Sequence, residues 1–205
     1  MNFIGISTVV AALLAAGPTW AGNGYCKGSA TGTAGEMVTS TFYVDGGAIK
    51  SQDAVWFPPR ADGNAGDDGP TMEVHYWPVA EAGPAVPTAL DVSITAFKGD
   101  AAKYKGAAAE LSLGERVAWR SDLRMFMGVG QAQLAVKNPR FPPTNPDLLD
   151  RIEGVREATA TIFSPDGRKV VSAVFNLSDH SSRDRLFHKA WAAAAAAASS
   201  STRCE

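Results

Sequence analysis

The amino-acid sequence predicts a mainly β fold, an antiparallel β-sandwich or an open barrel, with two helices. Several short segments alternate apolar and polar residues with a period of two, the pattern of strands that have one buried and one solvated face. Turn-forming residues separate these segments. Helical signals are confined to a short helix near residues 146–152 and a C-terminal helix near residues 182–198.

The N-terminal segment is typical of a secretory signal peptide. Residues 3–16 are almost all apolar or small, Pro18 ends any helix, and Thr19-Trp20-Ala21 offers a small-x-small cleavage site. The apolar run is too short to span a bilayer. The alternative is a buried N-terminal helix. We expect residues 1–21 to be removed, and residues 22–205 to form a single β-rich domain in the periplasm or the extracellular medium, with no transmembrane segment or lipid anchor.

The strands are predicted from alternation, in chain order, at residues 38–44, 71–76, 90–95, 131–136, 157–162 and 170–177. Asp45-Gly46-Gly47 predicts a turn toward residues 48–50. Residues 164–168 (Ser-Pro-Asp-Gly-Arg) predict a hairpin, because Pro sets φ for a turn and Gly accepts the positive φ that follows. The small, Gly-rich residues 28–35 predict a flexible segment. This segment is not a phosphate loop, because no Gly-Lys-Ser/Thr follows it.

Two helices complete the prediction. The first has Asn145 as its N-cap and Pro146 in its first turn, and it ends at Gly154. The second begins with a capping box at residues 181–184. Its apolar stripe predicts that it lies against a sheet, and it comprises Leu186, Phe187, Ala190, Trp191 and Ala194.

Cys26 and Cys204 are the only cysteines of the chain. An even cysteine count in an exported protein favours a disulfide. The one possible intramolecular pairing would join the first and last segments of the mature domain. Two unrelated thiols, or pairing between molecules, are the alternatives.

Charge gives little guidance about partners. The formal net charge is −2, with an acidic first half and a basic second half. No dense Lys/Arg cluster occurs, so we expect no nucleic-acid partner. Complementary packing of the two halves explains the asymmetry more simply than a basic binding face.

Candidate metal ligands fall into two groups: His180, Asp184 and His188, and Asp62, Asn64 and Asp68. The first group is spaced for one helix face, and the second has the oxygen ligands that calcium prefers. A simple i,i+4 pair on the helix and an acidic surface turn are the competing interpretations. We expect no cofactor, with a divalent metal as the alternative.

Tryptophan beside arginine is the second kind of candidate site. Trp56 and Arg60 flank a Phe-Pro-Pro segment, and Trp119 precedes Arg120. Proline cannot donate to a sheet ladder, so residues 56–60 are expected to form a loop or edge with Trp56 exposed. Exposed Trp and Arg can stack on sugars or bind a protein. Packing in the core is the alternative.

Glu73 and His75 share the polar face of one predicted strand, with Trp77 beyond them. Such a pair can transfer protons, although a solvated face is the more ordinary explanation. No Gly-x-Ser-x-Gly, His-Glu-x-x-His or Cys-x-x-Cys pattern accompanies it.

These observations favour an exported, non-catalytic β-sandwich domain, a binding or envelope-associated module for an unidentified protein or carbohydrate. The alternative is a small extracytoplasmic hydrolase or metal-dependent enzyme that uses His75, His180 or His188. An enzyme should have a concave pocket where a histidine meets a carboxylate. A binding module should have an exposed patch around Trp56 or Trp119.

Overall fold

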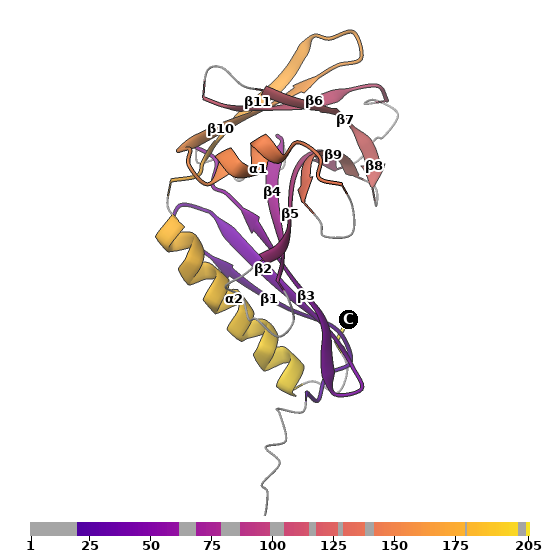
Figure 1. Ribbon diagram of the computed structural model, residues 1–205, viewed down its shortest axis with the longest axis vertical. Coiled ribbons are helices and arrows are strands. Elements are labelled where there is room, and N and C mark those ends of the chain that lie inside the picture. Colours follow the sequence, from indigo (N-terminus) through magenta and orange to yellow (C-terminus); the bar gives the residue numbers. More distant parts are fainter. Residues whose placement is uncertain are drawn as a thin grey trace, which may run out of the picture.

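The computed structural model describes residues 20–61, 69–78, 87–98, 105–114, 118–126, 129–137, 142–178, 180–200 and 204–205 (Figure 1). Most of these residues lie in two antiparallel sheets with a shared core, and two helices pack against them. The predicted mainly β fold is confirmed. The predicted signal peptide lies almost entirely outside the described residues.

The larger sheet, sheet A, has the strand order β1-β2-β3-β4-β5-β9-β8. Its strands are β1 (Gly24–Thr31), β2 (Met37–Asp45), β3 (Ala48–Phe57), β4 (Thr71–Pro78), β5 (Pro87–Lys98), β8 (Arg124–Phe126) and β9 (Val129–Lys137). Sheet B has the order β11-β10-β6-β7. Its strands are β6 (Ala108–Leu113), β7 (Ala118–Asp122), β10 (Glu157–Phe163) and β11 (Lys169–Asn176). The predicted hairpins β2–β3 and β10–β11 are both present.

The two faces of sheet A have different roles. One face carries alternate apolar residues such as Met72, Val92 and Leu134, which pack against residues such as Leu111 and Phe175 of sheet B. The short helix α1 (Pro146–Ile152) adds three buried side chains to this core. Because side chains alternate along a strand, the intervening residues point to the opposite face of sheet A. That face is polar.

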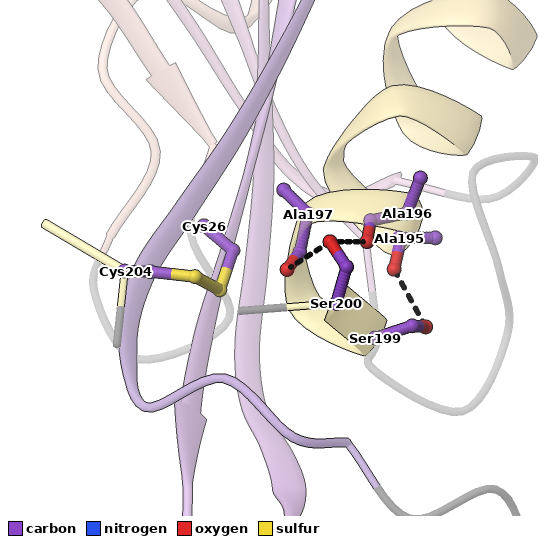
Figure 2. Close-up of a disulfide and its surroundings, with 7 residues drawn as sticks. All are labelled: Cys26, Ala195, Ala196, Ala197, Ser199, Ser200 and Cys204. Atoms are coloured by element: carbon purple, nitrogen blue, oxygen red, sulfur yellow. Dashed lines mark hydrogen bonds between the residues drawn. A yellow bond between two sulfur atoms is a disulfide. The ribbon is translucent and has the colours of Figure 1, made fainter. Parts of the chain in front are cut away.

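The C-terminal helix α2 (His180–Ser200) lies along β1 and β2 on the apolar face of sheet A (Figure 1). Phe42 of β2 meets Trp191 of α2 edge-on, with ring centroids 5.6 Å apart. The predicted apolar stripe of the helix is therefore confirmed as its sheet-facing side. Ser199 and Ser200 lie beyond the predicted end of the helix near residue 198, yet they continue it and donate hydrogen bonds of 2.8 Å to the carbonyls one turn back (Figure 2).

The predicted disulfide between Cys26 and Cys204 is present, with the two Cα atoms 4.9 Å apart (Figure 2). It joins β1 to the segment that follows α2. The backbone of this segment also pairs with the β1 end: Tyr25 N donates to Glu205 O and Cys204 N donates to Asn23 O, each at 2.7 Å. The first and last segments of the domain are thus held together by covalent and hydrogen bonds.

One sequence prediction about β1 was wrong, and three strands elsewhere were not predicted. The Gly-rich start of residues 28–35 is not a flexible segment, because Gly28 to Thr31 belong to β1 and pair with β2. Gly28 is required by packing: a Cβ there would press into backbone atoms of Ala190 and Ala194 in α2. Strands β6, β7 and β8 were also not predicted, since each is short and β7 contains no fully buried residue.

The predicted helix caps differ from those observed. Asn145 precedes α1, but with φ 48° it makes no side-chain cap, and its amide donates to the carbonyl of Leu134 in β9 instead. Helix α2 begins at His180, one residue before the predicted capping box. The Ser182 hydroxyl donates to the buried carboxylate of Glu36 at 2.7 Å. Asn145 and Ser182 therefore make hydrogen bonds to distant segments, which local sequence patterns do not encode.

Candidate functional site

A pocket opens on the polar face of sheet A, with a volume of about 630 Å³. This size falls within the range of about 300–1,000 Å³ typical of small-molecule sites. Strands β4, β5 and β9 form its floor, and residues of β7 and β8 form its rim. The residues that line this sheet A pocket are His75, Trp77, Asp91, Ser93, Ser121, Asp122, Arg124, Met125, Gln131 and Gln133.

Asp91 and Ser93 of β5 are both only 3% exposed, although they line the pocket. The Ser93 hydroxyl donates to one oxygen of Asp91 at 2.6 Å, and the Gln133 side-chain amide donates to the other. A buried carboxylate is costly without such partners, so these bonds account for its stability here. They also fix the positions of three polar groups relative to one another.

Glu73 anchors a second hydrogen-bond group on the same floor. The Nε2 of His75 lies 3.1 Å from Glu73 Oε2, and the Thr95 hydroxyl donates to Glu73 Oε1. Gln131 Nε2 donates weakly to Glu73 Oε2 across 3.5 Å. The side chains come from three neighbouring strands whose register brings them together. The predicted proximity of Glu73 and His75 is therefore present in the structure.

Electrostatics shift the titration of two groups near the pocket. Burial acts to lower the pKa of His75, but the hydrogen bond to Glu73 and the charges of Asp91, Glu73 and Asp53 outweigh it, so its pKa lies above the ordinary value. Burial raises the pKa of Asp53, and the positive charges of His75 and Lys27 partly offset this. The imidazolium of His75 thus serves as the counter-charge for surrounding carboxylates.

We expect an NMR titration to place the pKa of His75 above 6.5, the value of an unperturbed histidine. Because folding raises this pKa, the stabilisation from the His75 proton is fully present below pH 6.5 and is lost as the pH rises through the folded-state pKa. Glu73→Gln should lower the pKa of His75, because it removes the hydrogen-bonded carboxylate. A wild-type pKa at or below 6.5 would contradict this electrostatic account.

An aromatic surface completes the pocket. The ring of Trp77 is stacked with that of His75 at 27°, with centroids 6.0 Å apart. Both rings project from β4 on the polar face of sheet A, because they are two residues apart on one strand. At the rim, Arg124 and Asp122 are exposed and carry opposite charges. The pocket therefore offers hydrogen-bond donors, acceptors and an aromatic ring within one concave surface.

The prediction that Trp56 is exposed was wrong. Strand β3 continues to Phe57, and its alternation places Trp56 on the core face, where it is 4% exposed. The guanidinium of Arg183 lies over its ring at 5.3 Å and donates to the carboxylate of Glu153 at 2.9 Å. Pro58 follows Phe57, the last residue of β3, which is why the local pattern suggested a loop.

The other predicted ligand-binding residues are not gathered in one site. Arg60 bridges to Phe175 and lines a separate cavity of about 280 Å³ between the ends of the sheets. Trp119 packs partly against the core from β7. Arg120, its neighbour, is exposed on the outer face of sheet B and lies 4.7 Å from the ring centre of Phe163. None of these residues lines the sheet A pocket.

The predicted metal ligands are only partly described. His188 Nδ1 lies 2.8 Å from the backbone carbonyl of Asp184 on α2, and the Asp184 carboxylate accepts a 3.4 Å hydrogen bond from Arg183. The side chain of His180 lies outside the described residues, as does the segment with Asp62, Asn64 and Asp68. Among the described residues, no group of three His, Cys, Asp or Glu side chains could hold a metal ion.

Comparisons with protein-family models, with curated proteins and with solved structures found no match to this chain. Of the helices within the described ranges, none combines the length and the apolar character needed to cross a membrane. Because the comparisons found no match, the site is interpreted from its own chemistry.

Sequence reasoning identified Glu73, His75 and Trp77 but missed their partners on β5 and β9. Asp91 and Ser93 were recognised only as the polar positions of an alternating strand, and so were Gln131 and Gln133. The local pattern carried no signal, because Asp, Ser and Gln are ordinary residues of a solvated strand face. Bringing them together requires the register between strands, which the sequence does not state.

Proposed function

We propose that this protein is an exported binding module that holds a small, neutral, polyhydroxylated ligand, such as a sugar, in the sheet A pocket. The lining of the pocket carries the proposal. The Gln133 amide donates a hydrogen bond to the Asp91 carboxylate, and both side chains line the pocket together with Trp77. Each hydroxyl of a sugar both donates and accepts, so it suits a wall of carboxylates and amides, and the ring can pack on the apolar face of a sugar.

Export is supported by two independent features. The sequence pattern of residues 1–21 is that of a signal peptide. The disulfide between Cys26 and Cys204 is compatible with an oxidising compartment outside the cytoplasm. Mass spectrometry of the protein from the exported fraction tests the first feature: we expect a mature N-terminus at Gly22.

Calorimetry with a panel of neutral mono- and disaccharides tests ligand binding. We expect Trp77→Ala to weaken the binding of the sugar that binds best by roughly tenfold, because the upper range for one aromatic contact is about 1.5 kcal/mol. Asp91→Asn should weaken it as well, since the acceptor loses its charge. Arg120→Ala, on the outer face of sheet B, is the matched control and should leave binding unchanged. Binding that is lost with Arg120→Ala and kept with Trp77→Ala would contradict this site.

A second function, hydrolysis through His75, is favoured by one observation. His75 meets the carboxylate of Glu73 in a concave pocket, the feature expected of an enzyme. Against it, the hydroxyls of Ser93 and Thr95 donate to carboxylates rather than to His75, so neither is activated as a nucleophile. Turnover of the bound sugar that is abolished by His75→Gln, with binding retained, would favour the enzyme.

A further inference from the structure

A second aromatic feature lies on the polar face of sheet A, outside the pocket. The rings of Tyr25 and Tyr43 are 5.0 Å apart and inclined by 37°. Tyr25 is 54% exposed, which is unusual for a large aromatic side chain on a strand. Neither ring belongs to the cores of the domain. The pair therefore presents apolar surface to solvent from β1 and β2.

Strand register places this pair and the pocket on one continuous surface. Lys27 is opposite Thr41, and Thr41 is opposite Asp53 on β3. Val55 is opposite His75, so continuing this register places Asp53 beside Trp77. Tyr25 and Tyr43 lie opposite each other on the same face, two residues further along β1 and β2 than Lys27 and Thr41. With strands about 4.8 Å apart and residues about 3.4 Å apart, the Cα atoms of Tyr43 and Trp77 are separated by about 12 Å.

The surface between the two aromatic features is polar. Thr41 of β2 and Asp53 of β3 occupy it, in the row of side chains that leads from Lys27 to Trp77. Helix α2 packs on the opposite, apolar face of these strands. In the described part of the chain, no helix covers this polar face, so an extended ligand has room to lie on it.

Each charged group on this surface has a partner. Lys27 pairs with Glu205 at 3.2 Å, and His75 pairs with Glu73 at 3.1 Å. Asp53 lies within the field of both Lys27 and His75. Asp91 is satisfied by hydroxyl and amide donors. The surface carries more carboxylates than cations, so it does not attract a polyanion, and because each charged group already has a partner it suits an uncharged ligand.

We infer that the polar face of sheet A binds a neutral oligosaccharide chain, with one sugar in the sheet A pocket at Trp77 and a later sugar on the Tyr25–Tyr43 pair. This inference rests on the proposed function, because it extends the ligand of the same pocket. A single sugar ring cannot reach both aromatic features across this distance, so the preferred ligand is a chain of several units.

Calorimetry with a disaccharide and a hexasaccharide of the same neutral sugar tests the inference, using the maltose, cellobiose and N,N′-diacetylchitobiose series. We expect the hexasaccharide of one series to bind roughly tenfold more tightly than its disaccharide, the gain expected from the two tyrosine contacts. The double variant Tyr25→Ala/Tyr43→Ala should reduce hexasaccharide affinity to that of the disaccharide and leave disaccharide affinity unchanged. Trp77→Ala should weaken both.

The controls separate loss of binding from loss of folding. Tyr25→Phe/Tyr43→Phe keeps both rings and should retain most of the gain for the hexasaccharide. Val170→Ala removes an equally exposed apolar side chain from β11 and should change nothing. Equal affinity for short and long sugars would overturn the inference and leave the proposed function standing. Failure of every sugar to bind would overturn both.

Discussion

Replacing Cys26 and Cys204 together by alanine is expected to lower the free energy of unfolding by about 5 kcal/mol. The disulfide closes a loop over a sequence separation of 178 residues, and the chain-entropy model assigns about 5 kcal/mol to a loop of this length. Stabilities of single domains are about 5–15 kcal/mol, so this loss removes a large fraction of the total. We expect a fall of many degrees in Tm.

Urea unfolding of the oxidised wild type, the reduced wild type and the double alanine variant measures this effect. The reduced wild type and the variant should have the same midpoint, because both lack the cross-link. The slope of the transition should also be larger for both, since a chain without the cross-link exposes more surface when it unfolds. An unchanged midpoint after reduction would show that the backbone bonds of Cys204 and Glu205 to β1 hold the termini without the disulfide.

The parts of the fold that sequence predicted well are those whose cause is local. In β4, β10 and β11 one face is buried and the other is not, so alternation alone reveals the strand. The turns at residues 45–47 and 164–168 were predicted from their glycines, and these glycines do take the positive φ that such turns require. Cys26 and Cys204 were paired correctly because only one intramolecular pairing exists.

The parts that were missed depend on contacts between distant segments. Trp56 was expected in a loop because of the prolines that follow it, yet β3 extends far enough to bury it under Arg183 of α2. Asn145 was expected to cap a helix, but the carbonyl of Leu134 competes for its amide. Likewise, Asp91 and Gln133 become a site only when β5 and β9 are neighbours.

Gly28→Ala is the second substitution from which we expect a large effect. The added Cβ would lie 2.7 Å from the Cβ of Ala193 and even closer to backbone atoms of Ala190 and Ala194. A helix backbone cannot rotate away as a side chain can, so α2 must move as a unit. We expect a loss of about 2–3 kcal/mol in the free energy of unfolding, near the upper part of the range for overpacked sites.

Gly130→Ala is the matched control, because it places the same methyl group in β9 of the same sheet, where no atom lies within 4 Å of the new Cβ. There we expect a gain of about 0.4–1 kcal/mol, because alanine restricts the unfolded chain. Both variants are compared by urea unfolding. Equal stabilities would mean that α2 is not seated against β1 at this glycine.

The Gly28→Ala variant also tests whether the two faces of sheet A are independent of each other. Gly28 points toward α2, whereas Tyr25 and Lys27 point toward the polar face. A displacement of α2 should therefore reduce stability and leave the ligand surface on the other side of the strands in place. At temperatures where Gly28→Ala remains folded, we expect its affinity for a sugar that binds the wild type to be unchanged. Loss of binding in the folded variant would show that the position of α2 shapes the polar face, and that stability and ligand binding in this domain are coupled through β1.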